Sequence, residues 1–248
     1  MSKIKAFFKC AEELKSQFAH SDCLLTISVG QATHEEEVFD VTMELVNRSF
    51  ASCTLLIDDS LQRHNMALNS TKDADFFYDI SLKEGDLWLQ RNKKYYNSLT
   101  IPKRIFRWDK WLKHPKLSQC IKQVRVAIKD DAAYKKVFDK SIEDFLKKYS
   151  KRLPNINNFD WQRARKLSYD FVTEECAALC LWPELQCHFE AYPIKHNEAI
   201  TVTRERFIAP HYPQLLQAVN IGFRNIEQIK PQRFFCCSEE VFNAMRGQ

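Results

Sequence analysis

The sequence predicts an α/β domain with a mostly parallel sheet flanked by helices, and three features predict this fold class. Two apolar runs, 22–28 and 52–57, are continuous rather than alternating, as in strands buried on both faces of a parallel sheet. A helical pattern separates them, so a β-α-β unit is complete within the first sixty residues. Helical and strand-like stretches continue to alternate along the rest of the chain.

The other elements follow from periodicity and from helix signals. Thr33 and Glu36 have the spacing of a capping box and predict the start of the helix between the two strands. Pro102 predicts the end of the helix that precedes it. Further helices are expected over 3–19, 83–99, 115–129, 131–151 and 160–181. Further strands are expected over 104–108, 186–191, 204–209 and 233–237.

The composition is that of a folded soluble protein. The chain has 248 residues, of which 45% are hydrophobic and 28% charged, and we expect a single domain over 1–248. No apolar run approaches the ~18 residues of a spanning helix, so no membrane association is expected. Nine cysteines without a CxxC pair, and an N-terminal segment broken by lysines and glutamates, predict reduced thiols and a cytoplasmic location.

Three polar residues are expected at the carboxyl ends of strands, where open parallel sheets place their sites. They are Ser28, Asp58 and Tyr192. Ser28 lacks the GxSxG elbow of the hydrolases, so it is either a turn serine or a nucleophile whose oxyanion would lie near the amides around Gly30. Tyr192 either lies at the core boundary or presents its hydroxyl to a cleft.

The helix predicted over 160–181 has a carboxylate on its apolar face. On a helical wheel Glu175 falls inside the apolar stripe and Glu174 falls at its edge. A buried carboxylate is unfavourable unless it is paired or hydrogen-bonded. Glu175 is therefore either a site residue that holds a cation or moves a proton, or a structural residue in an ion pair.

Positive charge is concentrated in one part of the chain. Between residues 91 and 116 there are nine lysines and arginines and a single acid, Asp109. Such a segment either binds a polyanion or is a solvated basic face. The histidines His34, His188 and His196 have no metal-ligand spacing, and no metal or cofactor is expected. No glycine-rich phosphate loop is present either.

Together these features resemble the tRNA-dependent cyclodipeptide synthases, over essentially the whole chain. The matching motifs are Ser28-Val29-Gly30-Gln31, Glu175 on a helix and Tyr192-Pro193 after a late strand. The resemblance implies a Rossmann-like domain, similar to the catalytic domain of class I aminoacyl-tRNA synthetases. Gln31 and Pro193 resemble the Tyr-Pro group of the family.

The resemblance also implies roles. Ser28 would form an aminoacyl-enzyme with the first aminoacyl-tRNA, and the second would give a dipeptidyl-enzyme that cyclises to a diketopiperazine. Glu175 would bind the α-ammonium group and accept the proton of the attacking amine, and Tyr192 would relay the proton of Ser28. The family glutamate usually follows a tyrosine by four residues, but Phe171 stands there in this chain. Tyr169 is the nearest tyrosine, and Glu174 is the alternative glutamate.

Binding residues are implied in the same way. Besides Gly30, Gln31, Phe171, Glu174 and Pro193, a first amino-acid pocket would be lined by Leu24, Thr26, Leu55 and Ala178. A second, polar pocket would lie near Glu190 and 195–197. A basic helix over 83–97 would contact tRNA through Lys83, Arg91, Lys93 and Lys94. The partners would be aminoacyl-tRNAs, with no cofactor, metal or membrane, and the chain would be a monomer. A non-catalytic tRNA-binding protein and a serine hydrolase remain the alternatives.

Overall fold

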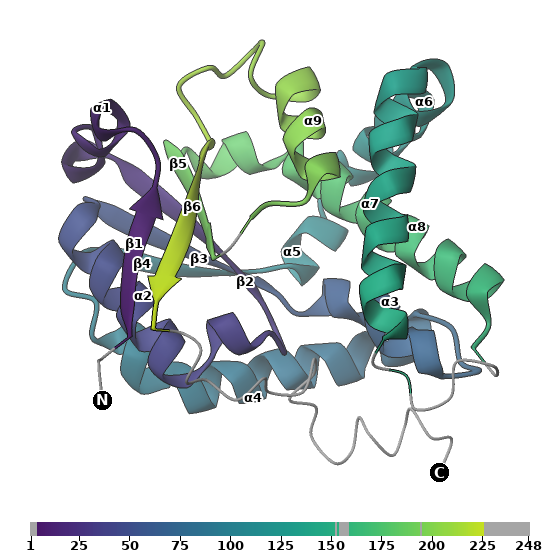
Figure 1. Ribbon diagram of the computed structural model, residues 1–248, viewed down its shortest axis with the longest axis horizontal. Helices are drawn as coiled ribbons and strands as arrows, with labels where there is room; N and C mark the ends of the chain where they lie inside the picture. Colours follow the sequence, from purple (N-terminus) through teal and green to yellow (C-terminus); the bar gives the residue numbers. More distant parts are fainter. Residues whose placement is uncertain (1–3, 152, 154–158, 194, 226–248) are drawn as a thin grey trace.

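A computed structural model describes residues 4–151, 153, 159–193 and 195–225, and within these residues six strands form one sheet (Figure 1). The strands are β1 Lys5–Lys9, β2 Asp22–Ser28, β3 Ser52–Asp58, β4 Lys103–Arg107, β5 Phe189–Pro193 and β6 Gln217–Arg224. Their order is β1-β6-β5-β2-β3-β4, and only β1 runs antiparallel to its neighbour. The predicted class, a mostly parallel α/β sheet flanked by helices, is confirmed.

Two hydrophobic cores cover the two faces of the central strands. Leu24 and Leu56 belong to one core, and Leu25 and Leu55 belong to the other, as the alternation of side chains along a strand requires. The helices of the first core are α6 Leu117–Asp130, α7 Ala132–Ser150, α8 Trp161–Leu179 and α9 Glu198–Phe207. The helices of the second core are α2 Glu36–Ser49 and α4 Tyr78–Asn97. Figure 1 shows α6 and α8 together at the right of the view and α4 along the bottom.

The strand order places a switch point at β2. The chain runs from β2 outward to β3 and β4, and later returns to the other side of β2 with β5 and β6. In open α/β sheets the crevice at such a point lies beyond the carboxyl ends of the strands and takes the ligand. Ser28 is the last residue of β2, and its partner in the parallel register is Asp58, the last residue of β3.

The helix expected over 3–19 is wrong. This segment contains β1, the short helix α1 Glu12–Lys15 and a 3₁₀ turn at Phe18–His20. In β1 the side chains of Ala6 and Phe8 point inward with the period of two that a strand requires. Five residue pairs join β1 to β6 in antiparallel register, so a partner more than two hundred residues away decides the structure of this segment.

The strand expected over 204–209 is also wrong, because most of this segment lies in α9. The helix begins where the Asn197 side chain accepts a hydrogen bond from the Ala199 amide at 3.0 Å, a capping signal that the prediction overlooked. Strand β6 was not predicted, and the strand expected over 233–237 lies outside the described residues.

The capping box expected at Thr33 and Glu36 is not formed. Thr33 lies in the 3₁₀ turn Ala32–His34, and α2 has no side-chain cap at its start. The carboxylate of Glu35, the residue before α2, turns instead toward α4 and accepts hydrogen bonds there. Two further short helices are α3 Arg63–Met66 and α5 Asp109–Leu112.

Candidate active site

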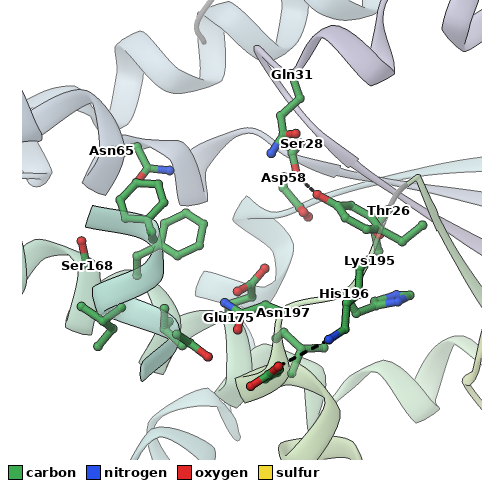
Figure 2. Close-up of a pocket in the computed structure, with 18 of the residues that line it drawn as sticks. Thr26, Ser28, Gln31, Asp58, Asn65, Ser168, Glu175, Lys195, His196 and Asn197 are labelled. Atoms are coloured by element: carbon green, nitrogen blue, oxygen red, sulfur yellow. Dashed lines mark hydrogen bonds and ion pairs between the residues drawn. The ribbon is translucent and has the colours of Figure 1, made fainter. Parts of the chain in front are cut away.

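A cavity of about 500 Å³ opens at the carboxyl ends of β2, β3 and β5, between these strands and α8. The strand side is lined by Thr26, Ser28, Asp58, Glu190 and Tyr192, and the α8 side is lined by Ser168, Phe171, Val172 and Glu175. Figure 2 shows Ser28 and Asp58 side by side at the top of the view, with Glu175 below them. The volume lies within the usual range for small-molecule sites.

Ser28 and Tyr192 are in contact. The Ser28 Oγ lies 3.3 Å from the Tyr192 hydroxyl, and either oxygen can donate (Figure 2). Burial raises the pKa of Tyr192 to about 12, against the opposing effect of its hydrogen bond with Ser28. The phenol therefore stays protonated at neutral pH, so it can donate a hydrogen bond to Ser28 or pass on its proton.

His34 stabilises the start of the turn after Ser28 through a hydrogen bond with the backbone. The fully buried His34 ring accepts a hydrogen bond at Nδ1 from the Ser28 amide at 3.0 Å. Burial lowers the pKa of His34 to about 4, so the ring is neutral and able to accept. Gly30 has a φ of 87°, the left-handed conformation that favours glycine, and it lets the chain turn sharply after the strand. The backbone around Ser28 is thus fixed by a buried side chain and a glycine.

The two glutamates on α8 have different surroundings. Glu174 is 8% exposed and accepts hydrogen bonds from Arg63 Nη1 and Trp108 Nε1, each at 2.9 Å. Burial alone would raise the pKa of Glu174, but hydrogen bonds from His64 and Arg63 and the charge of Arg63 lower it to about 2. Glu174 is therefore an ionised structural residue, and it is not among the residues that line the cavity.

Glu175 faces the cavity instead. Burial raises the pKa of the Glu175 carboxyl to about 7, an effect that the charge of His196 only partly opposes. A carboxyl that titrates near neutral pH can take up and release a proton during a reaction. Asp58 shares this environment, because burial raises its pKa well above the usual value and the nearby Glu175 and Asp59 charges raise it further.

A group of polar residues around Glu190 and His196 forms another part of the cavity wall. His196 lies 3.0 Å from Glu190 Oε1 through Nε2, and 2.9 Å from Asn220 Oδ1 through Nδ1. Arg204 pairs with the other oxygen of Glu190, which is only 2% exposed. Glu190 and residues 195–197 line the cavity, so the polar segment that the resemblance linked to a second pocket does reach it.

The structure brings only part of the expected site residues to the cavity. Thr26, Ser28, Gln31, Phe171, Glu175 and Tyr192 line it. Gly30 and Pro193 lie beside lining residues without being among them. Leu24 and Ala178 are fully buried in the core beneath, and the expectation that Leu55 lines the same pocket is wrong, because Leu55 faces the opposite side of the sheet.

Tyr169 does not reach the cavity either. Its ring packs against Phe138 of α7, with 5.3 Å between the ring centroids, and its position on α8 points away from the face that carries Phe171 and Glu175. Tyr169 is therefore not part of the proposed catalytic set. Conversely, Gln62 and Asn65 line the cavity but were not among the expected site residues. Asp58, which was expected at the carboxyl end of a strand together with Ser28 and Tyr192, also lines the cavity.

The basic helix is linked to the segment that follows Ser28. Arg91 on α4 donates to both oxygens of the buried Glu35 carboxylate, at 3.1 and 2.6 Å, and the Asn92 amide donates to one of them at 2.8 Å. Trp88 donates from Nε1 to the His34 carbonyl at 3.0 Å. The resemblance implies that Arg91 contacts tRNA, but its guanidinium already pairs with Glu35. The two contacts would therefore compete for the same side chain. Lys83, Lys93 and Lys94 are exposed on the same helix.

Metal sites and membrane spans are absent from the part of the chain that the structure describes. Among the described residues, no group of three or more histidines, cysteines, aspartates or glutamates could hold a metal ion. Within the same residues, no helix is both long and apolar enough to cross a membrane.

Comparison with solved structures finds relatives that cover nearly the whole chain. A CDPS (cyclodipeptide synthase) from Fluoribacter dumoffii is 39% identical, with a TM-score of 0.86, over 89% of this chain and 99% of that one. The cyclodipeptide synthase from Candidatus Glomeribacter gigasporarum, solved bound to Phe-tRNAPhe, is 15% identical, with a TM-score of 0.73, over 88% and 94%. AlbC, a cyclodipeptide synthase from Streptomyces noursei, is 14% identical, with a TM-score of 0.57, over 92% and 99%. No family model and no curated protein matches the chain.

The similarity to these synthases indicates an aminoacyl-transferring enzyme, built on a mostly parallel α/β sheet with a polar cavity at its switch point. The 39% identity over almost the full length of the Fluoribacter protein shows that the chain belongs to the cyclodipeptide synthases. As a member of this family, it is a cyclodipeptide synthase.

Proposed function

We propose that this chain joins two aminoacyl groups into a 2,5-diketopiperazine through esters on Ser28, and that each aminoacyl group is delivered by tRNA. The observation that carries the proposal is the contact between the Ser28 Oγ and the Tyr192 hydroxyl, in a cavity that also holds Glu175. The related synthase solved with Phe-tRNAPhe supports tRNA as the carrier. Gln31 and Pro193 support placing the chain in the Tyr-Pro group.

In the first step, the Ser28 Oγ attacks the ester carbonyl of an aminoacyl-tRNA. A new ester bond forms to Ser28, and the bond between the carbonyl carbon and the ribose oxygen of the tRNA breaks. Tyr192, which contacts Oγ, passes the serine proton to the departing ribose oxygen. Because one ester replaces another, the step needs no ATP.

In the second step, the amine of the serine-bound group attacks the ester carbonyl of the second aminoacyl-tRNA. An amide bond forms and the ester bond to the second tRNA breaks; Glu175 accepts the proton that the amine loses and returns it to the departing ribose oxygen. The free amine of the resulting dipeptide then attacks the Ser28 ester and closes the six-membered ring. Ser28 leaves as an alkoxide and recovers a proton through Tyr192.

Detection of the product tests the proposed function. The purified chain is supplied with a mixture of aminoacyl-tRNAs, and products are analysed by mass spectrometry. A cyclic dipeptide that disappears when the tRNA is digested beforehand supports the proposal. Binding of tRNA without any acyl transfer would identify a non-catalytic binding protein, and release of free amino acids alone would identify a hydrolase.

The pH profile should follow the ionisation of Glu175. The second step requires the carboxylate form, and the Glu175 carboxyl titrates at about 7. We expect kcat/KM for cyclic dipeptide to rise by about tenfold between roughly pH 6 and pH 8, since the ionised fraction rises by that factor around a pKa of 7. Initial rates of product formation in buffers of constant ionic strength check this. A flat profile would exclude Glu175 as the proton acceptor.

The exposed lysines of α4 should govern affinity for tRNA. We expect the double variant Lys93→Ala/Lys94→Ala to raise KM for aminoacyl-tRNA several-fold with little change in kcat. It should also reduce the slope of log affinity against log salt by about one for each phosphate that the two lysines neutralise in the wild type. Lys136→Ala, which removes an exposed lysine from α7, is the matched control. An unchanged KM and salt slope would show that this part of α4 does not bind the nucleic acid.

A further inference from the structure

Asp58 is a buried carboxyl group in the cavity that the reaction described above does not use. It ends β3 directly beside Ser28, and the two are partners in the parallel register, so both side chains point to the same face of the sheet. Asp58 lines the cavity, and Figure 2 shows it next to Ser28. The residue is only 4% exposed, so its carboxyl group is shielded from bulk water.

One oxygen of the Asp58 carboxyl lacks a partner. This atom, Oδ1, is buried and has no hydrogen-bond partner among the described residues. The neighbouring carboxyl Asp59 shows the usual arrangement: it accepts a hydrogen bond from the Ser60 amide at 2.6 Å and pairs with Arg107 at 2.5 Å. A buried polar atom without a partner is unfavourable, so a ligand group that satisfies it is favoured. Ten side-chain atoms of this kind occur among the described residues, and three belong to residues that line the cavity, Asp58, Ser168 and Trp182. Of these three, only Asp58 is a carboxyl group.

The shape and charge of the site indicate which ligand group fits. Asp58 and Glu175 are two of the five carboxyl residues that line the cavity. The Glu175 charge acts on both Asp58 and Tyr192, the partner of Ser28. Burial and the neighbouring Glu175 and Asp59 charges raise the pKa of Asp58, which is the response of a carboxyl group without a cation beside it. The proposed substrate brings one cation to this place, because the α-carbon of an aminoacyl ester carries an ammonium group next to the carbonyl that Ser28 attacks. An ammonium group has three donors, enough for two carboxylates.

We propose that Asp58 is a second carboxylate of the catalytic centre, which accepts a hydrogen bond from the α-ammonium group of the aminoacyl ester on Ser28. This inference rests on the proposed function and extends it. Asp58 and Glu175 together hold the ammonium group while the first ester forms. When the amine attacks the second substrate, Glu175 takes its proton, and Asp58 continues to orient the amine.

The test compares two substrates that differ only at the α-nitrogen. One is an aminoacyl-tRNA, and the other is the same aminoacyl-tRNA with its α-amine acetylated, which cannot carry the positive charge. The rate of acylation of Ser28 by each is measured in single-turnover reactions by the label retained on precipitated protein. The wild-type chain is expected to prefer the free ammonium form strongly.

Asp58→Asn should reduce this preference by at least about tenfold, since it removes the negative charge but keeps the shape of the side chain. Glu143→Gln, which alters an exposed carboxylate of α7 that does not line the cavity, should leave the preference at the wild-type value. An Asp58→Asn variant that slows both substrates equally, or leaves the ratio unchanged, would overturn the proposal.

Stability is measured in parallel by thermal unfolding. Asp58→Asn should unfold at the same temperature as the wild-type chain or higher, because it removes a buried acid that has no cation beside it. If it fails to fold, Asp58→Ser provides the same comparison of substrates. If the wild-type chain is not acylated by aminoacyl-tRNA at all, the proposed function fails, and the role of Asp58 fails with it. Acylation of the wild type with an unchanged ratio in the variant would leave the proposed function standing and reject Asp58 alone.

Discussion

Ser28→Ala is expected to abolish both the aminoacyl-enzyme and the cyclic dipeptide, with a loss of activity of at least about a thousandfold. The physical reason is that alanine offers no oxygen to which the aminoacyl group can be transferred. The variant should still bind aminoacyl-tRNA with nearly the wild-type affinity, because the exposed lysines of α4 are unchanged. Intact-protein mass spectrometry after brief mixing with aminoacyl-tRNA detects the ester directly.

The control for this experiment is Ser16→Ala, which removes the hydroxyl of an exposed serine that does not line the cavity. It should show wild-type acylation and product formation. Ser28 is 8% exposed and its hydroxyl has Tyr192 as partner, so the loss of the hydroxyl should destabilise the fold by no more than about 1–2 kcal/mol. Cyclic dipeptide formed by Ser28→Ala at the wild-type rate would rule out the covalent mechanism.

The strands that form the site could be predicted from the sequence because their signal is local. The apolar runs that became β2 and β3 are almost entirely buried, and their polar last residues, Ser28 and Asp58, mark the edge where the site lies. The segment at 3–19 could not be predicted in this way, because β1 is a strand through its pairing with β6. Local periodicity carries no information about a partner so distant in sequence.

The same distinction applies to the site. The helical wheel separates Glu175 from Glu174, and the structure gives these two residues different surroundings. The wheel could not show that Arg63, His64 and Trp108 surround Glu174, because these residues come from other parts of the fold. Leu55 was misplaced because side chains alternate along β3, and the family resemblance by itself does not say which face of the strand a residue occupies.

Glu175→Gln and Glu174→Gln should differ in their effect on activity, and the difference shows which of the two neighbouring glutamates is catalytic. Glu175→Gln should lower cyclic dipeptide formation by about 10²–10⁴-fold, because the amide accepts no proton, while the aminoacyl-enzyme still forms and accumulates. Glu174→Gln should leave the activity per folded molecule close to that of the wild type. Single-turnover assays that follow the aminoacyl-enzyme and the product separately distinguish these outcomes, and the reverse pattern would move the catalytic role to Glu174.

In stability the order of the two variants should be reversed. Glu174→Gln, which keeps its activity, should be the less stable variant. Glu174→Gln leaves the guanidinium of Arg63 buried without its carboxylate, and we expect a destabilisation of about 3–5 kcal/mol. In Glu175 the folded-state pKa is raised from 4.5 to about 7, so the folded chain binds this proton more tightly than the unfolded chain. Stability of the wild type therefore falls as the pH rises through this interval. Glu175→Gln removes the effect, so its advantage in thermal unfolding over the wild type should be larger at pH 8 than at pH 5. An advantage that does not grow with pH would show that the Glu175 carboxyl is not held protonated by its cavity.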